Sequence, residues 1–302
     1  MNLREAVFGT PPSALAAVGV EAVQLSPFIP DAAAIEDLAD GSLDRLVVHA
    51  PPGTLERRYA LAHGLRALAA DGVLIALAPK DKGGARLRKE LEAFGCPVIE
   101  TARRHHRICA TKRPEAPTGL AEAMADGAPR LSQTLGLWTQ PGLFAWDRVD
   151  PGSALLLETK MDLSGRGADL GCGGGVVSRA VLGSPKVTSL TLIDLDRRAL
   201  DAAKRNVADA RVAFLQYDLR GPPPLTDLDF IVMNPPFHEG GDEDRHLGQA
   251  FIAAAAVMLR KGGVCRLVAN IALPYEAVMK RCFSSVVLVA RGGGYKVLEA
   301  RR

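Results

Sequence analysis

Short apolar runs alternate with longer amphipathic segments along most of this chain. In the first third, apolar runs at residues 43–49 and 73–78 are separated by a helical pattern at 55–70, and a charged helical pattern follows at 85–94. Alternation of this kind is typical of βαβ units with parallel strands. The pattern therefore predicts an α/β domain at the N-terminal end.

The same alternation continues more regularly toward the C-terminus. Strands are predicted at 187–194, 212–215, 228–233 and 264–270. Helices are predicted before the first of them, at 176–182, and between them at 197–208 and 245–259. Two apolar runs that lie close together in sequence, near 283–289 and 295–298, predict an antiparallel last strand. The C-terminal part is therefore predicted to be a doubly wound, Rossmann-like sheet.

A change in composition separates these two α/β parts. Residues 114–129 are rich in Pro, Ala, Gly, Thr and Glu and show no periodicity, which is typical of a linker. At 302 residues the chain is long enough for two modest domains. We therefore expect an N-terminal domain over 1–113 and a C-terminal domain over 130–302.

A faint internal repeat links the two domains. Residues 44–53 end in His-Ala-Pro-Pro-Gly, and residues 229–237 end in Met-Asn-Pro-Pro-Phe. Ala50 stands where the second copy has Asn234, and no glycine loop precedes the first copy. We interpret the N-terminal domain as a truncated copy of the C-terminal one that has lost its chemistry.

Composition narrows the class of protein. Apolar residues make up 48% and charged residues 24% of the chain, and no apolar run approaches the roughly 20 residues that cross a bilayer. The five cysteines are scattered and odd in number, which argues against a disulfide framework and a zinc site. Without a signal-peptide pattern, we expect a cytoplasmic monomer that binds neither metal nor membrane.

Candidate chemistry begins with a glycine loop between a predicted strand and a predicted helix. Asp169, Gly171, Gly173 and Gly175 alternate with other residues. Glycines let the backbone turn sharply and let a ligand approach it, and the helix N-terminus offers free N–H donors. The spacing does not fit the dinucleotide fingerprint, because Val176 follows where a third glycine would be needed. The loop resembles motif I of class I S-adenosylmethionine methyltransferases.

Two acidic positions could complete a nucleoside site. Asp194 ends a predicted strand 19 positions after Gly175, where a carboxylate can accept from both hydroxyls of a ribose. Asp196 is the alternative, although it could instead cap the following helix. Asp218 follows the next strand and could accept from an adenine amino group or serve as a turn residue.

The sharpest signal is Asn234-Pro235-Pro236-Phe237 after a predicted strand. Two prolines fix the backbone and remove two N–H donors. An exocyclic amine is a poor nucleophile, but the Asn234 oxygen and the Pro235 carbonyl could orient its lone pair toward a sulfonium methyl group. Phe237 could stack on the planar ring. The plainer alternative is a rigid turn with a buried phenylalanine.

These motifs resemble the bacterial rRNA guanine-N2 methyltransferases that act on small-subunit rRNA, and a close relative that acts on large-subunit rRNA. The resemblance covers nearly all of the C-terminal domain. It is carried by Pro141-Gly142-Leu143-Phe144, residues 169–175, Asn234-Pro235-Pro236-Phe237-His238, Val268-Ala269-Asn270, Leu273-Pro274-Tyr275 and Tyr295-Lys296-Val297. It also implies a degenerate methyltransferase-like domain ahead of the active one.

The resemblance implies an S-adenosylmethionine-dependent rRNA guanine-N2 methyltransferase that needs no metal. The cofactor would be bound by Asp169, Gly171, Gly173, Gly175, Asp194 and Asp218. Asn234, Pro235 and Phe237 would act on a guanine that is flipped out of its stack. One alternative is an adenine-N6 or protein glutamine methyltransferase, for which Asn-Pro-Pro-Tyr is typical. A second is a non-catalytic RNA-binding assembly protein.

The expected partner is ribosomal RNA or a ribosomal subunit. The net charge of +3 does not by itself indicate nucleic-acid binding. Basic residues are nevertheless concentrated late in the N-terminal domain, at Lys80, Lys82, Arg86, Arg88, Lys89, Arg103, Arg104, Arg107, Lys112 and Arg113. They form either a solvated face or a set of phosphate contacts.

Overall fold

The chain folds into two compact units. The computed structural model describes residues 4–236, 238–239, 242–243 and 245–302, with the backbone alone at 238–239, 242–243 and 245. The N-terminal unit comprises Met1–Pro129 and Gln140–Gly142, and the C-terminal unit comprises Arg130–Thr139 and Leu143–Arg302. Among the described residues, no helix is long and apolar enough to cross a membrane.

The N-terminal unit contains a six-stranded sheet in the order β2-β1-β3-β4-β6-β5. Its strands are β1 (Glu5–Phe8), β2 (Val23–Gln24), β3 (Leu43–His49), β4 (Leu68–Pro79), β5 (Ile99–Arg103) and β6 (His106–Lys112). The first four pair in parallel, and β6 pairs antiparallel with both β4 and β5. The predicted βαβ arrangement is therefore present, closed by an antiparallel hairpin.

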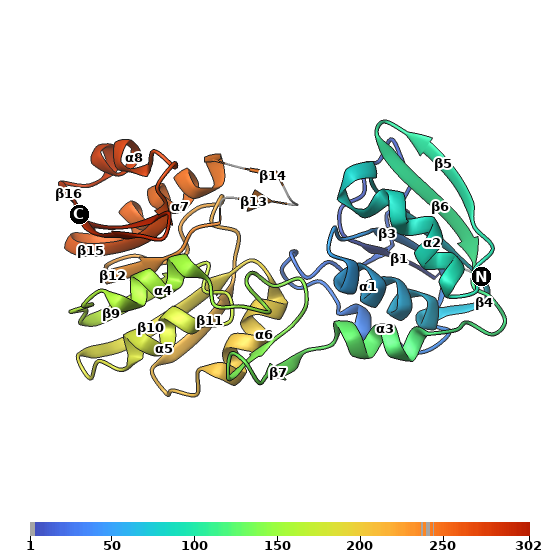
Figure 1. The fold of residues 1–302 in the computed structure, drawn as a ribbon, viewed down its shortest axis with the longest axis horizontal. Helices are drawn as coiled ribbons and strands as arrows, with labels where there is room; N and C mark the ends of the chain where they lie inside the picture. The colour runs from blue at the N-terminus through green and yellow to red at the C-terminus, as the bar shows by residue number, and fades with distance from the viewer. Residues whose placement is uncertain (1–3, 237, 240–241, 244) are drawn as a thin grey trace. The chain divides into compact units, whose positions relative to one another are not determined.

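Helices cover mainly one face of this sheet (Figure 1). They are α1 (Thr54–Ala67), α2 (Ala85–Ala93) and α3 (Leu120–Gly127), with the short turns η1 (Ile35–Asp37) and η2 (Lys80–Gly84). Leu61 of α1 and Leu87 of α2 pack on that face beside Leu46 of β3. The opposite face carries a smaller cluster in which Ala16, from a loop, packs with Val47.

The segment predicted as a linker, residues 114–129, contains α3. Ala123 is buried against the core of the N-terminal unit. Gly127 lies so close to α1 that an added Cβ would come within 2.3 Å of Tyr59 Cβ. The eight-residue helix is too short to be stable alone, so packing against α1 stabilises it. Because this helix depends on tertiary packing, the composition of residues 114–129 does not reveal it.

The C-terminal unit contains a seven-stranded sheet in the order β11-β10-β9-β12-β15-β17-β16. Its strands are β9 (Gly165–Leu170), β10 (Val187–Asp194), β11 (Val212–Gln216), β12 (Leu228–Met233), β15 (Leu259–Asn270), β16 (Ser285–Gly292) and β17 (Tyr295–Arg301). The first five strands of the order are parallel, and β17 runs antiparallel between β15 and β16. This confirms the predicted doubly wound α/β sheet with an antiparallel last strand.

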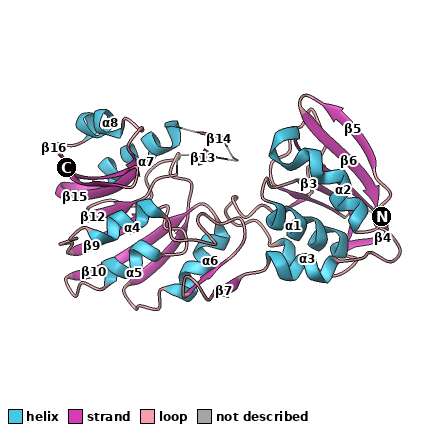
Figure 2. Cartoon of the chain, viewed as in Figure 1, coloured by secondary structure: helices cyan, strands magenta, loops and turns pink. Residues whose placement is uncertain are grey.

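Helices cover both faces of this sheet (Figure 2). They are α4 (Pro151–Glu158), α5 (Val176–Leu182), α6 (Arg197–Asn206), α7 (Arg245–Met258) and α8 (Tyr275–Cys282). Along β12, Phe230 and Val232 join the core under α4–α6, whereas Ile231 and Met233 join the core under α7 and α8. A strand buried on both faces explains the continuous apolar run in the sequence.

Two small hairpins complete the C-terminal unit. They are formed by β7 (Arg130–Ser132) with β8 (Leu137–Thr139), and by β13 (His238–Glu239) with β14 (Asp242–Glu243).

The internal repeat is visible in strand register. The β3–β4 pairing shifts from Leu43↔Leu68 to Arg45↔Val73, and the β12–β15 pairing shifts from Leu228↔Leu259 to Phe230↔Val264. In each copy the residue three positions after the leucine of the second strand is left-handed, with φ of 61° at Asp71 and 81° at Gly262. The two sheets thus share the same irregularity as well as the same proline-ended strand.

Candidate active site

The glycine loop follows β9 and leads into α5. Gly171, Gly173 and Gly175 all have left-handed φ values, between 51° and 81°. A Cβ added at Gly173 would meet nothing within 4 Å, whereas one at Gly171 would lie 3.1 Å from the Phe251 ring and 3.7 Å from Pro236 Cδ. The loop therefore faces open space on one side and touches the Asn-Pro-Pro turn on the other. The structure thus brings together Gly171 and Pro236, residues of two motifs that lie 65 positions apart in sequence.

Asp169 lies beneath this loop. Its side chain is buried, and its carboxylate accepts a hydrogen bond from Ser178 Oγ of α5 at 2.6 Å. Burial raises the pKa of Asp169 to about 7, and the nearby Asp194 carboxylate adds to the effect. Asp169 therefore joins the strand to the helix that the loop begins. Its contact with the cofactor stays a prediction.

Asp194 ends β10 and points at the loop. One carboxylate oxygen accepts from Gly173 N and the other from Asp196 N, both at 2.9 Å. Burial raises the pKa of Asp194 to about 6. The Leu195 backbone N–H group also interacts with this carboxylate. Because a carboxylate offers about four lone-pair sites, Asp194 can still accept from a ribose hydroxyl.

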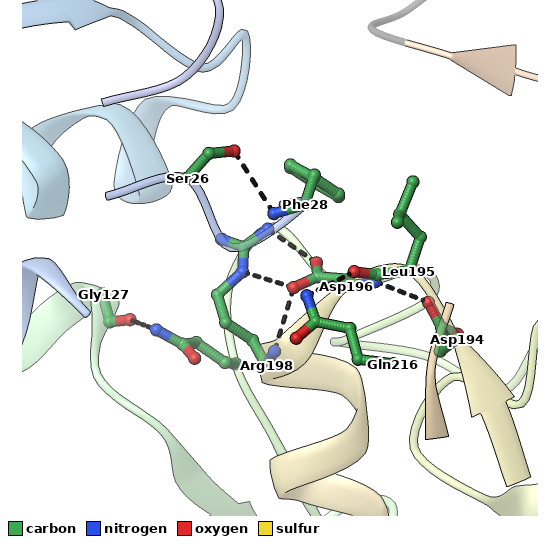
Figure 3. A network of polar contacts seen from close by, with 9 residues as sticks. Ser26, Phe28, Gly127, Asp194, Leu195, Asp196, Arg198 and Gln216 are labelled. Carbon is green, nitrogen blue, oxygen red and sulfur yellow. Dashed lines mark hydrogen bonds and ion pairs between the residues drawn. The ribbon is translucent and has the colours of Figure 1, made fainter. Parts of the chain in front are cut away.

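Asp196, the alternative ribose ligand, already binds other groups of the protein. Its side chain accepts from the backbone N–H of Arg198 at 3.0 Å and caps α6. It also forms a bidentate ion pair with the Arg198 guanidinium, and both side chains are buried (Figure 3). Gln216 Nε2 donates to the Leu195 carbonyl at 3.0 Å and ties the turn to β11. These contacts favour Asp194 over Asp196 as a ligand for ribose.

Asp218 follows β11 at the edge of the sheet. Its carboxylate accepts from the Arg220 backbone N–H at 2.9 Å and from the Arg220 guanidinium at 2.7 Å. Hydrogen bonds from that guanidinium lower the pKa of Asp218. The Asp218 carboxylate is thus ionised, and some of its acceptor sites are taken by Arg220. Its contact with an adenine amino group stays a prediction.

Asn234 directly follows β12, in the middle of the sheet. Its Nδ2 donates to Asp150 Oδ2 at 2.9 Å and to Ser153 Oγ at 3.0 Å. Asp150 also caps α4 by accepting from Ser153 N at 2.6 Å. No local pattern connects residues 84 positions apart, so this contact leaves no signal in the sequence.

The rest of the turn is described in part. Pro235 is buried, and among the described residues no N–H group donates to its carbonyl. Phe237, predicted to stack on the substrate, lies outside the described residues. The amide oxygen of Asn234 and the carbonyl of Pro235 are thus two neighbouring acceptors at the end of one strand.

A further residue, which no local motif indicates, supports the glycine loop. Asn206, at the end of α6, donates through Nδ2 to the carbonyls of Gly174 and Trp138, each at 2.9 Å, and accepts from Trp138 N at 2.7 Å. The Arg205 guanidinium lies 4.4 Å from the centroid of the Trp138 ring system. The loop is therefore held by β8 and α6 as well as by its own turn.

The site fits S-adenosylmethionine. Gly173 leaves room where a side chain would intrude, the loop opens a helix N-terminus, and Asp194 can accept from a ribose. Asn234 and Pro235 lie next to that loop, where a methyl acceptor could meet the cofactor. The fold and this arrangement define the class I S-adenosylmethionine-dependent methyltransferases.

Comparison with known proteins identifies the family. The model of the methyltransferase small domain matches residues 134–299. Ribosomal RNA small subunit methyltransferase C of Pseudomonas paraeruginosa is 34% identical over 270 residues, which cover 87% of this chain and 80% of that protein. The protein of that name from Erwinia tasmaniensis is 34% identical over 282 residues, which cover 89% of this chain and 78% of that protein.

A solved structure agrees with these sequences. The T. thermophilus 16S rRNA N2 G1207 methyltransferase (RsmC), in complex with AdoMet and guanosine, matches with a TM-score of 0.79 and 25% identity, over 99% of this chain and 88% of that chain. The chain therefore belongs to the methyltransferase small domain family and, within it, to the ribosomal RNA small subunit methyltransferase C family.

Proposed function

We infer that this chain is an S-adenosylmethionine-dependent methyltransferase that methylates the exocyclic N2 amine of a guanine in small-subunit rRNA. The observation that carries the inference is the amide of Asn234, whose nitrogen is bound by Asp150 and Ser153 at the strand end next to the glycine loop. The relatives named for small-subunit rRNA supply the substrate class.

The proposed chemistry depends on positioning. When bound, S-adenosylmethionine would supply a methyl group on a sulfonium sulfur, which would keep the electron pair of the broken carbon–sulfur bond and leave as a neutral thioether. A guanine amine has a delocalised lone pair, so the protein must hold its two N–H groups in a way that turns the lone pair toward that methyl group. The Asn234 oxygen and the Pro235 carbonyl are suited to accept one N–H each. The amine can lose its extra proton after transfer, so no base is required.

The guanine must leave its stack to reach this site. Stacking of Phe237 on the base remains part of the proposal, as do the contacts of Asp169 and Asp218 with the cofactor. A cytoplasmic location, a monomeric state and a reaction without metal remain predictions. An adenine-N6 or glutamine methyltransferase would need the same two acceptors, so the guanine assignment depends on the relatives.

The test is methyl transfer from labelled S-adenosylmethionine to small subunits, large subunits and free rRNA, followed by nucleoside analysis. We expect N2-methylguanosine on small-subunit rRNA. Asn234→Ala should lower kcat by about 1,000-fold through lost orientation, with the Kd for S-adenosylmethionine unchanged. Label in adenine or protein would favour the other enzyme classes. Absence of label despite cofactor binding would favour the non-catalytic RNA-binding protein.

A further inference from the structure

We propose that Asp150 and Ser153 are positioning residues that fix which end of the Asn234 amide faces the substrate. The inference rests on the proposed function, in which the Asn234 oxygen accepts a hydrogen bond from the substrate amine. Asp150 and Ser153 lie on the N-terminal turn of α4, whereas Asn234 ends β12. The contact therefore joins two elements of the C-terminal unit.

Chemistry decides the orientation of the amide. The Asn234 side chain has a donor end and an acceptor end of similar shape, and rotation by half a turn exchanges them. An ionised Asp150 can only accept, so a rotated Asn234 would place oxygen against oxygen. In the observed orientation the two N–H groups have two acceptors, Asp150 Oδ2 and Ser153 Oγ, at 2.9 and 3.0 Å. The oxygen is then left for another donor.

Asp150 is itself firmly placed. It accepts from Ser153 N at 2.6 Å, and its own carbonyl accepts from Ala154 N at 2.9 Å. Gly152 packs so closely on β17 that an added Cβ would lie 2.8 Å from the Tyr295 ring. One turn later, the Leu156 side chain is fully buried in the core. Packing of α4 on the sheet therefore determines where the Asp150 carboxylate lies, and the carboxylate determines the orientation of the Asn234 amide.

Loss of this contact should affect the reaction more than the binding of the cofactor. The groups suited to hold S-adenosylmethionine are the glycine loop after β9 and Asp194 after β10, and neither hydrogen-bonds to Asp150. An Asn234 amide that is free to rotate would present its NH2 group to the substrate amine for part of the time. Turnover should fall while the Kd for the cofactor stays constant.

Two substitutions at position 150 separate this role from helix capping. Asp150→Asn keeps the cap and keeps an oxygen within reach of Asn234, so kcat should stay within about five-fold of the wild type. Asp150→Ser also caps the helix, but its short side chain cannot reach Asn234. We expect kcat to fall by about 10- to 100-fold, the effect of losing one hydrogen bond to a charged group, with the protein still folded by Tm and the cofactor Kd unchanged.

A reciprocal exchange gives the second test. Asn234→Asp places two carboxylates in contact and should abolish turnover. Adding Asp150→Asn removes one of the two carboxylates in contact and leaves an oxygen of position 234 facing the substrate. The double variant should regain at least about 10-fold in kcat over Asn234→Asp alone, because the repulsion between the two charges is removed. A purely structural Asp150 would not produce this rescue.

The outcomes are distinct. If the wild type transfers no methyl group to rRNA, the proposed function fails, whatever the variants do. If the wild type is active and Asp150→Ser matches it in kcat, the positioning role is wrong. The role is also wrong if the double variant is no more active than Asn234→Asp while both remain folded by Tm and bind the cofactor.

Discussion

The two halves of this molecule end equivalent strands in a pair of prolines but surround these prolines with different partners. In the C-terminal unit, Asn234 precedes the two prolines and is held by Asp150 and Ser153. In the N-terminal unit, Ala50 takes that place, and the carbonyls of Pro51 and Pro52 accept from a fully buried Arg57 at 3.1 and 2.7 Å.

Arg57 is in turn paired with the buried Glu90 through two contacts of 2.7 Å. The carbonyls of the N-terminal proline pair are therefore occupied by the protein itself. The difference teaches that a proline pair after a strand does not by itself make a substrate site. The side chains around it decide whether its carbonyls are available to a substrate.

The cofactor side of the two units differs as well. Strand β1 holds the place in its sheet that β9 holds in the other, between the equivalents of β10 and β12. A cavity of about 210 Å³ lies at the end of β1. It is lined by Val7, Gly9, Thr10, Pro11, Ser13, Ala16, Val18 and Gln24. None of these residues carries the carboxylate that Asp194 provides in the C-terminal unit, so a ribose would find no matching acceptor.

The largest expected effect concerns the pair that fills the N-terminal turn. Arg57→Met should lower the free energy of unfolding by about 3–5 kcal/mol, because Glu90 would be left buried without its partner. Arg57→Met with Glu90→Met should recover most of the loss. Urea denaturation measures both. The exposed pair Arg88–Glu92 is the control, and Arg88→Met should change little. If the double variant is as unstable as Arg57→Met alone, the loss of stability does not come from leaving Glu90 without its partner, and the prediction is wrong.

The next effect is specific to the C-terminal unit. The pKa of Asp169 is raised from an ordinary 3.8 to about 7, so the folded chain binds this proton more tightly than the unfolded chain does. Its stabilising contribution is complete below pH of about 4 and is lost as pH rises through about 7. Relative to Asp169→Asn, the cofactor-free wild type should lose on the order of 4 kcal/mol over that range.

Urea denaturation at several pH values, for both proteins, measures this difference. Asp162→Asn is the control, because the Lys186 ammonium lowers the pKa of that exposed carboxyl and moves its contribution below this pH range. Parallel stability curves for the wild type and Asp169→Asn would contradict the prediction.

The smallest effect tests whether the N-terminal unit contacts RNA. Exposed Arg103 ends β5, and Arg104 and His105, both exposed and with left-handed φ values, form the turn to β6. Replacing both arginines by glutamine should reduce the salt dependence of rRNA binding by about one to two phosphate contacts and leave kcat unchanged. Arg179→Gln, an exposed position on α5, is the matched control. An unchanged salt slope would mean that this turn is only a solvated face.

Much of this site could be predicted from local sequence. Asp194 and Asn234 each follow or end an apolar run. Because strands and helices alternate along the chain, the carboxyl ends of the parallel strands lie at one edge of the sheet. The helix α8 and the helix α3 were not predicted, because both are short and depend on the surfaces they cover. Asp196 could be told from Asp194 only once its ion pair with Arg198 was visible.

The sequence by itself determined the class of fold, the glycine loop and the proline-fixed turn, because period, glycine and proline act on the backbone within a few residues. Only the tertiary structure decided which carbonyls are free and which way an amide points. Asp150 and Asn234 are 84 positions apart, and Arg57 and Glu90 are 33 apart. Hydrogen bonds between such residues depend on where packed helices place them, and packing is a property of the whole sheet.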